Sequence, residues 1–300
     1  MRRVSIVGVP SSAASYAAGQ DLAPAALRGA GLADALSASG LEVHDAGDLS
    51  HQVWAPDRDH PLAQNVGQVI ESLVELCDRL VPLLTRGDLL LVVGGNCTIA
   101  LGVVAALHRI DEGLPVLLYV DRDYDMNTPD TTADGTLDWM GMAHALDLPG
   151  CVDALVEALR PRPLLFPDRV AWLGVGRGTE WERRQAGRLR LQVATSDELS
   201  ADPVGSANDA LAYLPTGPLA VHMDVDVLDF IDAPLAENAD GRNSGPSLDQ
   251  MVQALVQAAR DPRMRALSLG EINPTRCSGD PAALPRFVRA IARVLSAGSA

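Results

Sequence analysis

Acidic residues recur at every second position in two parts of this 300-residue sequence. The first set is Asp121, Asp123 and Asp125, and the second is Asp224 and Asp226. In an extended strand, alternate side chains point to the same side, so the members of each set would lie together. Carboxylates a few ångströms apart cannot all stay ionised without a counter-charge, and oxygen ligands suit Mg²⁺ or Mn²⁺. We therefore predict a metal site rather than solvated loop residues, in which two ions could share carboxylates and convert a bridging water to hydroxide near neutral pH.

Two further apolar segments end in polar sequences, GGNCT at 94–98 and GEINP at 270–274. Cys97 can be a metal ligand, a buried inert thiol or a nucleophile at a helix N-terminus, and we favour the ligand. Glu271 can contact the substrate directly, or it can act indirectly through the residues that do. His222 precedes the second acidic set, and we interpret it as a hydrogen-bonded core histidine.

The elements that must position these residues alternate between strand and helix. Apolar runs predict strands at 4–9, 41–48, Leu89–Val93, Val116–Val120, Val170–Val175, 191–194, 219–227 and 266–269. Helical spacing predicts helices at 24–39, 65–86, 98–109, 152–159, Glu180–Leu189, 207–214, Leu248–Arg260 and 284–295. This order predicts a single α/β domain over residues 1–300 with a mostly parallel sheet of about eight strands. Ligands of such sheets bind at the carboxyl ends of the strands, and a closed barrel is the competing architecture.

The composition restricts the classes of partner. The chain has 24 Lys+Arg, all of them arginine, against 39 Asp+Glu, which gives a net charge of −15. That balance argues against nucleic acid and anionic membranes, and it would attract a small cationic substrate. The four cysteines form no CxxC pair, and the apolar run at the N-terminus is too short for a signal peptide, so we expect free thiols and a cytoplasmic location.

The polar sequences, taken together, resemble a known family. GGNCT, DRDYDMNTPDTT, HMDVDVLD and GEINP are similar in order and spacing to the GGDHS, DAHxDxN, SxDxDxxDP and E-hydrophobic-NP motifs of the arginase/agmatinase family of ureohydrolases. The resemblance covers nearly the whole chain. It implies a three-layer αβα sandwich, two Mn²⁺ ions, hydrolysis of a guanidinium group to urea, and assembly into trimers or hexamers.

The resemblance also implies roles for individual residues. The implied metal ligands are Asp121 and Asp224 bridging the ions, Cys97 and Asp125 on one ion, and Asp123 and Asp226 on the other. The implied catalytic residues are Glu271, which meets the guanidinium, and Asp138 or His144, one of which protonates the leaving amine. For His144, a purely structural role is the alternative. The implied substrate-binding residues are Asn127, Thr132, Asp134, Glu180 and Glu271.

Three departures from the family motifs alter these expectations. Cys97 and Asp123 stand where the family has histidine ligands, so five aspartates and a thiolate would place −6 against the +4 of two divalent ions. The excess negative charge should raise the pKa of a shared water, and a thiolate favours softer ions such as Zn²⁺. Asp134 stands where arginases carry a serine near the substrate carboxylate, and it would repel that group.

The resulting prediction is a metal-dependent hydrolase of a small guanidino compound with a neutral or cationic tail, rather than plain L-arginine. A catalytically degenerate family member that acts as a binding or regulatory subunit is the alternative. An enzyme that uses Cys97 as its nucleophile is a third interpretation.

Overall fold

A single eight-stranded sheet forms the centre of the molecule, whose computed structural model describes residues 3–110, 112–238 and 243–298. The strands are β1 (Arg3–Gly8), β2 (Glu42–Asp48), β3 (Leu89–Val93), β4 (Val116–Val120), β5 (Val170–Val175), β6 (Gln192–Thr195), β7 (Leu219–Asp224) and β8 (Met264–Gly270). They lie in the order β2-β1-β3-β8-β7-β4-β5-β6, and every pair of neighbouring strands is parallel. All eight predicted strands are confirmed. The closed barrel is excluded, because β2 and β6 are the two edges of an open sheet.

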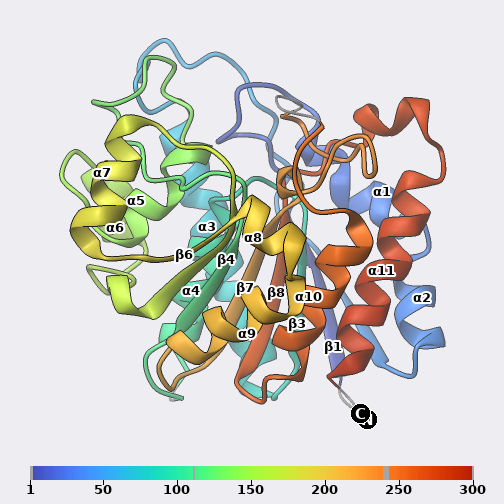
Figure 1. Cartoon of the computed structure of the whole chain (residues 1–300). Helices are drawn as coiled ribbons and strands as arrows, with labels where there is room; N and C mark the ends of the chain where they lie inside the picture. The colour runs from blue at the N-terminus through green and yellow to red at the C-terminus, as the bar shows by residue number, and fades with distance from the viewer. Residues whose placement is uncertain (1–2, 111, 239–242, 299–300) are drawn as a thin grey trace.

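Helices cover both faces of the sheet, as Figure 1 shows. One layer contains α1 (Ala23–Gly29), α2 (Leu32–Ala38), α8 (Ser196–Ala201), α9 (Pro203–Tyr213), α10 (Leu248–Arg260) and α11 (Ala283–Ala297). The other contains α3 (Val66–Thr85), α4 (Ile99–His108), α5 (Gly141–Ala145), α6 (Asp153–Ala158) and α7 (Glu180–Leu189). The predicted three-layer αβα sandwich is therefore confirmed.

The apolar sequence of the central strands explains why both faces need a helical cover. In β3, Leu89, Leu91 and Val93 belong to the core under one helical layer, whereas Leu90 and Val92 belong to the core under the other. All five side chains are buried. A parallel strand that is apolar at every position can be stable only between two helical layers.

Several helices and strands differ from the sequence predictions in their bounds, or were not predicted. The helix predicted at 24–39 is broken into α1 and α2, because Gly31 adopts a φ of 87° between them. The short helix α8 was not predicted, since six residues carry too little periodicity. The strand predicted at 219–227 ends at Asp224 and continues as a 3₁₀ turn over Val225–Val227. Among the described residues, no helix combines the length and the apolar character needed to cross a bilayer.

Candidate active site

The candidate site lies where four neighbouring strands end. Strands β3, β8, β7 and β4 are adjacent in the sheet, so their carboxyl ends bring the four polar sequences together. The loops that follow these ends gather at the top of Figure 1. This is the edge at which parallel α/β sheets bind their ligands.

The loop after β4 carries the first acidic set, but its backbone is not extended. Asp121 is fully buried, and its Oδ1 accepts a hydrogen bond from the amide of Asp123 at 2.6 Å. Asp125 has a left-handed φ of 51°, and its carboxylate accepts a hydrogen bond from the Tyr119 hydroxyl. The three aspartates therefore do not follow the alternation of an extended strand. The turn brings ligand atoms of Asp121 and Asp125 together, whereas Asp123, which lines the same cavity as Asp125, is paired with Arg177.

The second acidic set is also shaped by a turn rather than by a strand. Asp224 ends β7, and its Oδ1 accepts a hydrogen bond from the amide of Asp226 at 2.7 Å in the 3₁₀ turn. The Cys97 thiol donates to Asp224 Oδ2 at 3.2 Å. Because β3 and β7 both adjoin β8, Cys97 lies within contact of a residue 127 positions away.

These residues form two groups that could each hold a metal ion. Ligand atoms lie within 4.8 Å of one another in the set Cys97, Asp121 and Asp125, and again in the set Asp121, Asp224 and Asp226. Burial, reinforced by the neighbouring carboxylates, raises the pKa of Asp121, Asp125 and Asp224 well above the usual range, and burial raises that of Asp226 to about 6. The two arginines that approach Asp226 therefore do not offset the crowding of acidic groups in the cluster.

The donor atoms fit a divalent cation. Oδ2 of Asp121 and Oδ1 of Asp226 are buried and have no hydrogen-bond partner. Buried polar atoms are normally satisfied, so oxygens left unpaired between carboxylates indicate space for a cation. The carboxylates suit Mn²⁺ or Mg²⁺, whereas the Cys97 sulfur suits Zn²⁺.

Asp123 belongs to neither group, because it is paired with Arg177. Nε of Arg177 donates at 2.8 Å to both carboxylate oxygens of Asp123, and its Nη2 donates to Oδ2 at 2.6 Å. The loop after β5 holds the arginine in place, since the amides of Gly176 and Arg177 both donate to the carbonyl of Arg122. Arg177 therefore forms an ion pair on the pocket wall.

Glu271 and Asp138 form a buried pair of acidic side chains next to these groups. Their side chains are hydrogen-bonded to each other, and burial followed by repulsion from Asp138 raises the pKa of Glu271. Gln20 donates to Glu271 Oε1 at 2.5 Å, and the amide of Cys97 donates to Asp138 Oδ1 at 2.7 Å. Glu271 has a left-handed φ of 66°, a conformation that non-glycine residues adopt mainly where the surroundings enforce it. Two carboxyl groups in hydrogen-bond contact must hold a proton between them.

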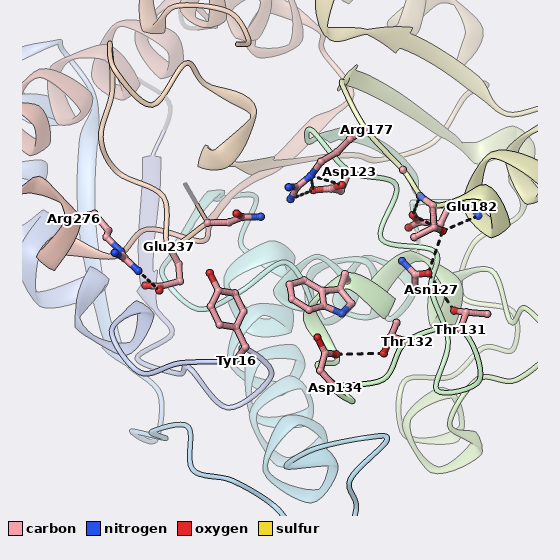
Figure 2. A pocket seen from close by; sticks show the side chains of 14 residues that line it. Tyr16, Asp123, Asn127, Thr131, Thr132, Asp134, Arg177, Glu182, Glu237 and Arg276 are labelled. Atoms are coloured by element: carbon pink, nitrogen blue, oxygen red, sulfur yellow. Dashed lines mark hydrogen bonds and ion pairs between the residues drawn. The ribbon is translucent and has the colours of Figure 1, made fainter. Parts of the chain in front are cut away.

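An open pocket of about 830 Å³ lies above this cluster and shares lining residues with it, and Figure 2 shows the side chains that line the pocket. At its base a smaller cavity is lined by Asp125, Asp138, Asp224, Asp226 and Glu271. The pocket and the cavity share the residues Tyr16, Asp123, Trp139, Arg177 and Asn238. A ligand in the pocket would therefore reach the carboxylates by passing these side chains.

The outer part of the pocket contains the predicted substrate-binding residues Asn127, Thr132 and Asp134, and their roles remain predictions. Asn127 Oδ1 accepts a hydrogen bond from Thr131, and Thr132 donates to Asp134 Oδ1 at 3.3 Å. These short polar side chains stand on the same side of the pocket in Figure 2. They leave a wall able to hydrogen-bond a polar tail.

Glu180 does not line this pocket, whereas Glu182 does. Glu180 is exposed and pairs with Arg184 one turn along α7. Glu182 is buried, accepts from the amides of Thr179 and Met126, and completes the N-terminal capping box of α7. The Thr179-x-x-Glu182 spacing is a capping signal that the sequence analysis did not use.

The sequence analysis also missed the two side walls of the pocket. Tyr16 stacks on Trp139 at a ring-centroid distance of 5.7 Å, and Arg276 pairs with Glu237 at 2.7 Å (Figure 2). Tyr16 lies in the loop after β1, whose carboxyl end faces the same edge of the sheet. The position of Tyr16 after the first strand could therefore have indicated that it lies near the site. No sequence motif indicated Glu237 or Arg276.

His144 lies outside the pocket and has both ring nitrogens occupied. Its Nδ1 donates to the carbonyl of Met140 at 2.7 Å, and its Nε2 accepts from the amide of Val152 at 3.0 Å. Burial lowers its pKa to about 4. This geometry supports the structural alternative for His144 and leaves Asp138 as the candidate proton donor near the pocket base.

Acid should therefore destabilise the fold through His144. The pKa of His144 is about 4 in the folded chain and 6.5 in the unfolded chain. As the pH falls below 6.5, the unfolded chain takes up a proton that the folded chain does not, so the free energy of unfolding is highest above pH 6.5 and decreases until the pH reaches about 4. The free energy of unfolding should fall by about 3 kcal/mol, since a difference of one pKa unit corresponds to about 1.36 kcal/mol. Urea denaturation between pH 7 and 4 should show a shallower pH dependence for His144→Gln than for the parent. A pH dependence that the substitution leaves unchanged would contradict this role.

His222 is a core histidine, as the sequence analysis favoured. It is fully buried, its Nδ1 contacts Ser268 Oγ at 2.9 Å, and its ring stacks on Tyr119 at 5.1 Å. Burial lowers its pKa to about 3, so the ring is neutral. It supports Tyr119, which in turn holds Asp125.

Comparisons with known proteins agree with this architecture. The sequence model of the arginase family matches residues 2–294. An arginase from Bacillus caldovelox is 29% identical over 243 residues, which cover 78% of this chain and 79% of the relative. The crystal structure of that arginase superposes with a TM-score of 0.85 at 23% identity over 99% and 98% of the two chains. The formimidoylglutamase of Bacillus subtilis superposes with a TM-score of 0.75 at 18% identity over 99% and 86%. The extent of the family match shows that this chain belongs to the arginase family.

Proposed function

We propose that the chain is a metal-dependent amidinohydrolase that cleaves a C–N bond of a small guanidino compound, giving urea or a urea derivative and an amine. The observation that carries this proposal is the buried carboxylate cluster with unpaired oxygens at the base of an open pocket. Members of the family are hydrolases, and the relatives include both arginases and a formimidoylglutamase. The substrate of this chain is therefore argued from its own pocket.

Glu271 is positioned to receive the guanidinium group. Its carboxyl group lies at the pocket base, where Gln20 and Asp138 fix its orientation. A divalent ion held by the neighbouring aspartates would supply a nucleophilic water at neutral pH. Glu271 would hold the guanidinium carbon against that cluster, which lowers the entropic cost of the attack.

Asp138 is positioned to provide the proton for the leaving amine. It shares a hydrogen bond with Glu271, and burial raises the pKa of both carboxyl groups, which favours a proton held between them. General acids work best when their pKa lies close to the operating pH. Arrival of a cationic guanidinium beside Glu271 would favour transfer of the shared proton to Asp138.

The pocket wall favours a neutral or cationic tail on the substrate. Asp134 lines the outer pocket and would repel a carboxylate. The positive charge of Arg276 is already paired with Glu237, whose other oxygen accepts a hydrogen bond from Asn273. The stacked rings of Tyr16 and Trp139 offer an aromatic face to a cation.

Urea release from a panel of guanidines tests the proposed function. The purified protein would be stripped with chelator, reloaded with Mn²⁺, Zn²⁺ or Co²⁺, and assayed on L-arginine, agmatine and a neutral alkylguanidine. We expect metal-dependent urea release with a lower KM for agmatine or the neutral guanidine than for L-arginine. Absence of both ion binding and urea release would reject the proposal. Light scattering of the same sample tests the proposed trimer or hexamer.

A degenerate site is the second candidate, and the pairing of Asp123 with Arg177 favours it. That ion pair occupies a residue which the family resemblance places on a metal ion. The double substitution Cys97→His with Asp123→His restores the family ligands. Urea release by this variant and none by the parent would show that the parent has a catalytically degenerate site.

A further inference from the structure

Both unpaired oxygens of the acidic cluster belong to one of its ligand groups, whereas the other group contains only one of them, Asp121 Oδ2. Asp121 Oδ2 and Asp226 Oδ1 have no hydrogen-bond partner, and both residues belong to the group completed by Asp224. Asp121 is fully buried and Asp226 is 4% exposed, so bulk water does not satisfy these atoms. A cation between Asp121, Asp224 and Asp226 would satisfy both of them.

The other ligand group is engaged by internal hydrogen bonds. The Cys97 sulfur donates its hydrogen to Asp224 Oδ2, and Asp125 Oδ2 accepts the hydrogen of the Tyr119 hydroxyl. Two of its three members therefore already have partners within the protein. A second ion in this group would have to break both contacts.

Asp123 is separated from the cluster by the same arginine that lines the pocket. Arg177 contacts both oxygens of Asp123 and also lies 3.7 Å from Asp226 Oδ2. A bidentate arginine–carboxylate pair is among the stronger ionic contacts in proteins. While this pair persists, both oxygens of Asp123 are engaged by Arg177.

Two guanidinium groups supply the charge that a second ion would bring. Arg122 lies 3.3 Å from Asp226 Oδ2, and Arg177 approaches the same oxygen from the pocket side. Their combined charge equals that of one divalent ion.

We propose that this chain binds one divalent cation, between Asp121, Asp224 and Asp226, and that Arg177 keeps Asp123 out of the coordination shell. The inference deepens the proposed metal-dependent function and rests on it for the presence of an ion. Arg177 is thus a positioning residue, which sets the number of carboxylates available to the metal.

Titration of the chelator-stripped protein with Mn²⁺ alone tests the number of ions. We expect one Mn²⁺ per chain by mass spectrometry of metal content, with the electron paramagnetic resonance spectrum of an isolated ion. Reloading with Co²⁺ should give no cobalt–thiolate absorption, because Cys97 is not a ligand. Two ions per chain with spin coupling would overturn the inference while leaving the proposed function intact. Absence of any bound ion would overturn both.

A double-mutant cycle tests the role of Arg177, with the Mn²⁺ dissociation constant from calorimetry as the readout. Asp123→Asn should change it by less than about threefold, because the amide oxygen still accepts from Arg177 and the residue is not a ligand. Arg177→Gln should tighten binding by about tenfold or more, since Asp123 becomes available. In that background, Asp123→Asn should weaken binding by about tenfold, the size expected for a residue that supports a metal site.

The matched control for loss of charge is Arg188→Gln, on the exposed face of α7, which should leave the Mn²⁺ dissociation constant unchanged. A purely electrostatic role for Arg177 predicts instead that the two substitutions act additively. Additive effects, or weakening of about tenfold by Asp123→Asn in the parent, would overturn the inference. Because the parent alone reports the number of ions, misfolding of a variant does not remove the test.

Discussion

Replacing Asp121 with asparagine should abolish binding of the divalent ion and hydrolysis, while it makes the ion-free protein more stable. Asp121 belongs to both candidate ligand groups, so its loss affects every arrangement of ions that the site allows. We expect the affinity for Mn²⁺ to fall by about 1,000-fold, which corresponds to about 4 kcal/mol. Calorimetric titration with Mn²⁺ and urea release measure the two losses.

The gain in stability follows from the same environment. Oδ2 of Asp121 has no hydrogen-bond partner, and burial and the surrounding carboxylates raise the pKa of Asp121. An asparagine keeps the Oδ1 acceptor for the amide of Asp123 and adds an amide that can donate to the neighbouring carboxylates. We expect the ion-free variant to be about 1–3 kcal/mol more stable by urea denaturation at pH 7.

Asp249→Asn provides the matched control for this prediction. Asp249 is exposed, and its contact with Arg293 at 3.4 Å is a surface ion pair, which contributes little to stability. The control should change neither the affinity for Mn²⁺ nor the stability of the ion-free protein by a measurable amount. A destabilised ion-free Asp121→Asn variant would show that the cluster is satisfied without a cation.

The fold could be predicted because the strands are apolar along their whole length. Continuous runs such as Leu89–Val93 fit only a sheet covered on both faces, and their alternation with helical periods indicates a parallel sheet. Short helices such as α8 (Ser196–Ala201) were missed because one or two turns show no period. The choice between an open sheet and a barrel depends on long-range pairing, which periodicity does not contain.

The location of the site could also be predicted, but the orientation of its side chains could not. Polar residues after apolar strands placed Asp121, Asp224 and Glu271 at one edge of the sheet. The expectation for Asp123 assumed an extended backbone, whereas the chain turns at Asp125 and Asp123 meets Arg177. That partner comes from the loop after β5, and nothing in the local sequence indicates the contact.

Glu182 illustrates a similar limit. The sequence analysis took Glu180 from the family pattern, and a difference of two positions on a helix moves a side chain to another face. The capping box with Thr179 holds Glu182 inward and leaves Glu180 exposed. Local capping geometry therefore decided which acid lines the pocket.

Replacing Glu271 with glutamine should lower kcat/KM for the preferred guanidine by about 1,000-fold while the ion remains bound. Glu271 lies at the pocket base outside both metal ligand groups, and its side chain contacts Asp138 and Gln20. Loss of a buried charged partner of this kind costs about 4 kcal/mol in the transition state. Steady-state urea release and metal analysis on the same preparation measure the two quantities.

The isosteric change separates charge from structure. Glutamine keeps an Oε1 that accepts from Gln20, and its amide can donate to Asp138, so the backbone at this left-handed position should be retained. Glu180→Gln on the exposed face of α7 removes the same charge outside the pocket and should leave kcat/KM unchanged. If Glu271→Gln instead loses the ion, Glu271 acts on the metal site and not on the guanidinium. If the variant keeps both the ion and full activity, another acid of the pocket wall must bind the substrate cation. Glu182 is the next candidate, because it is buried in that wall.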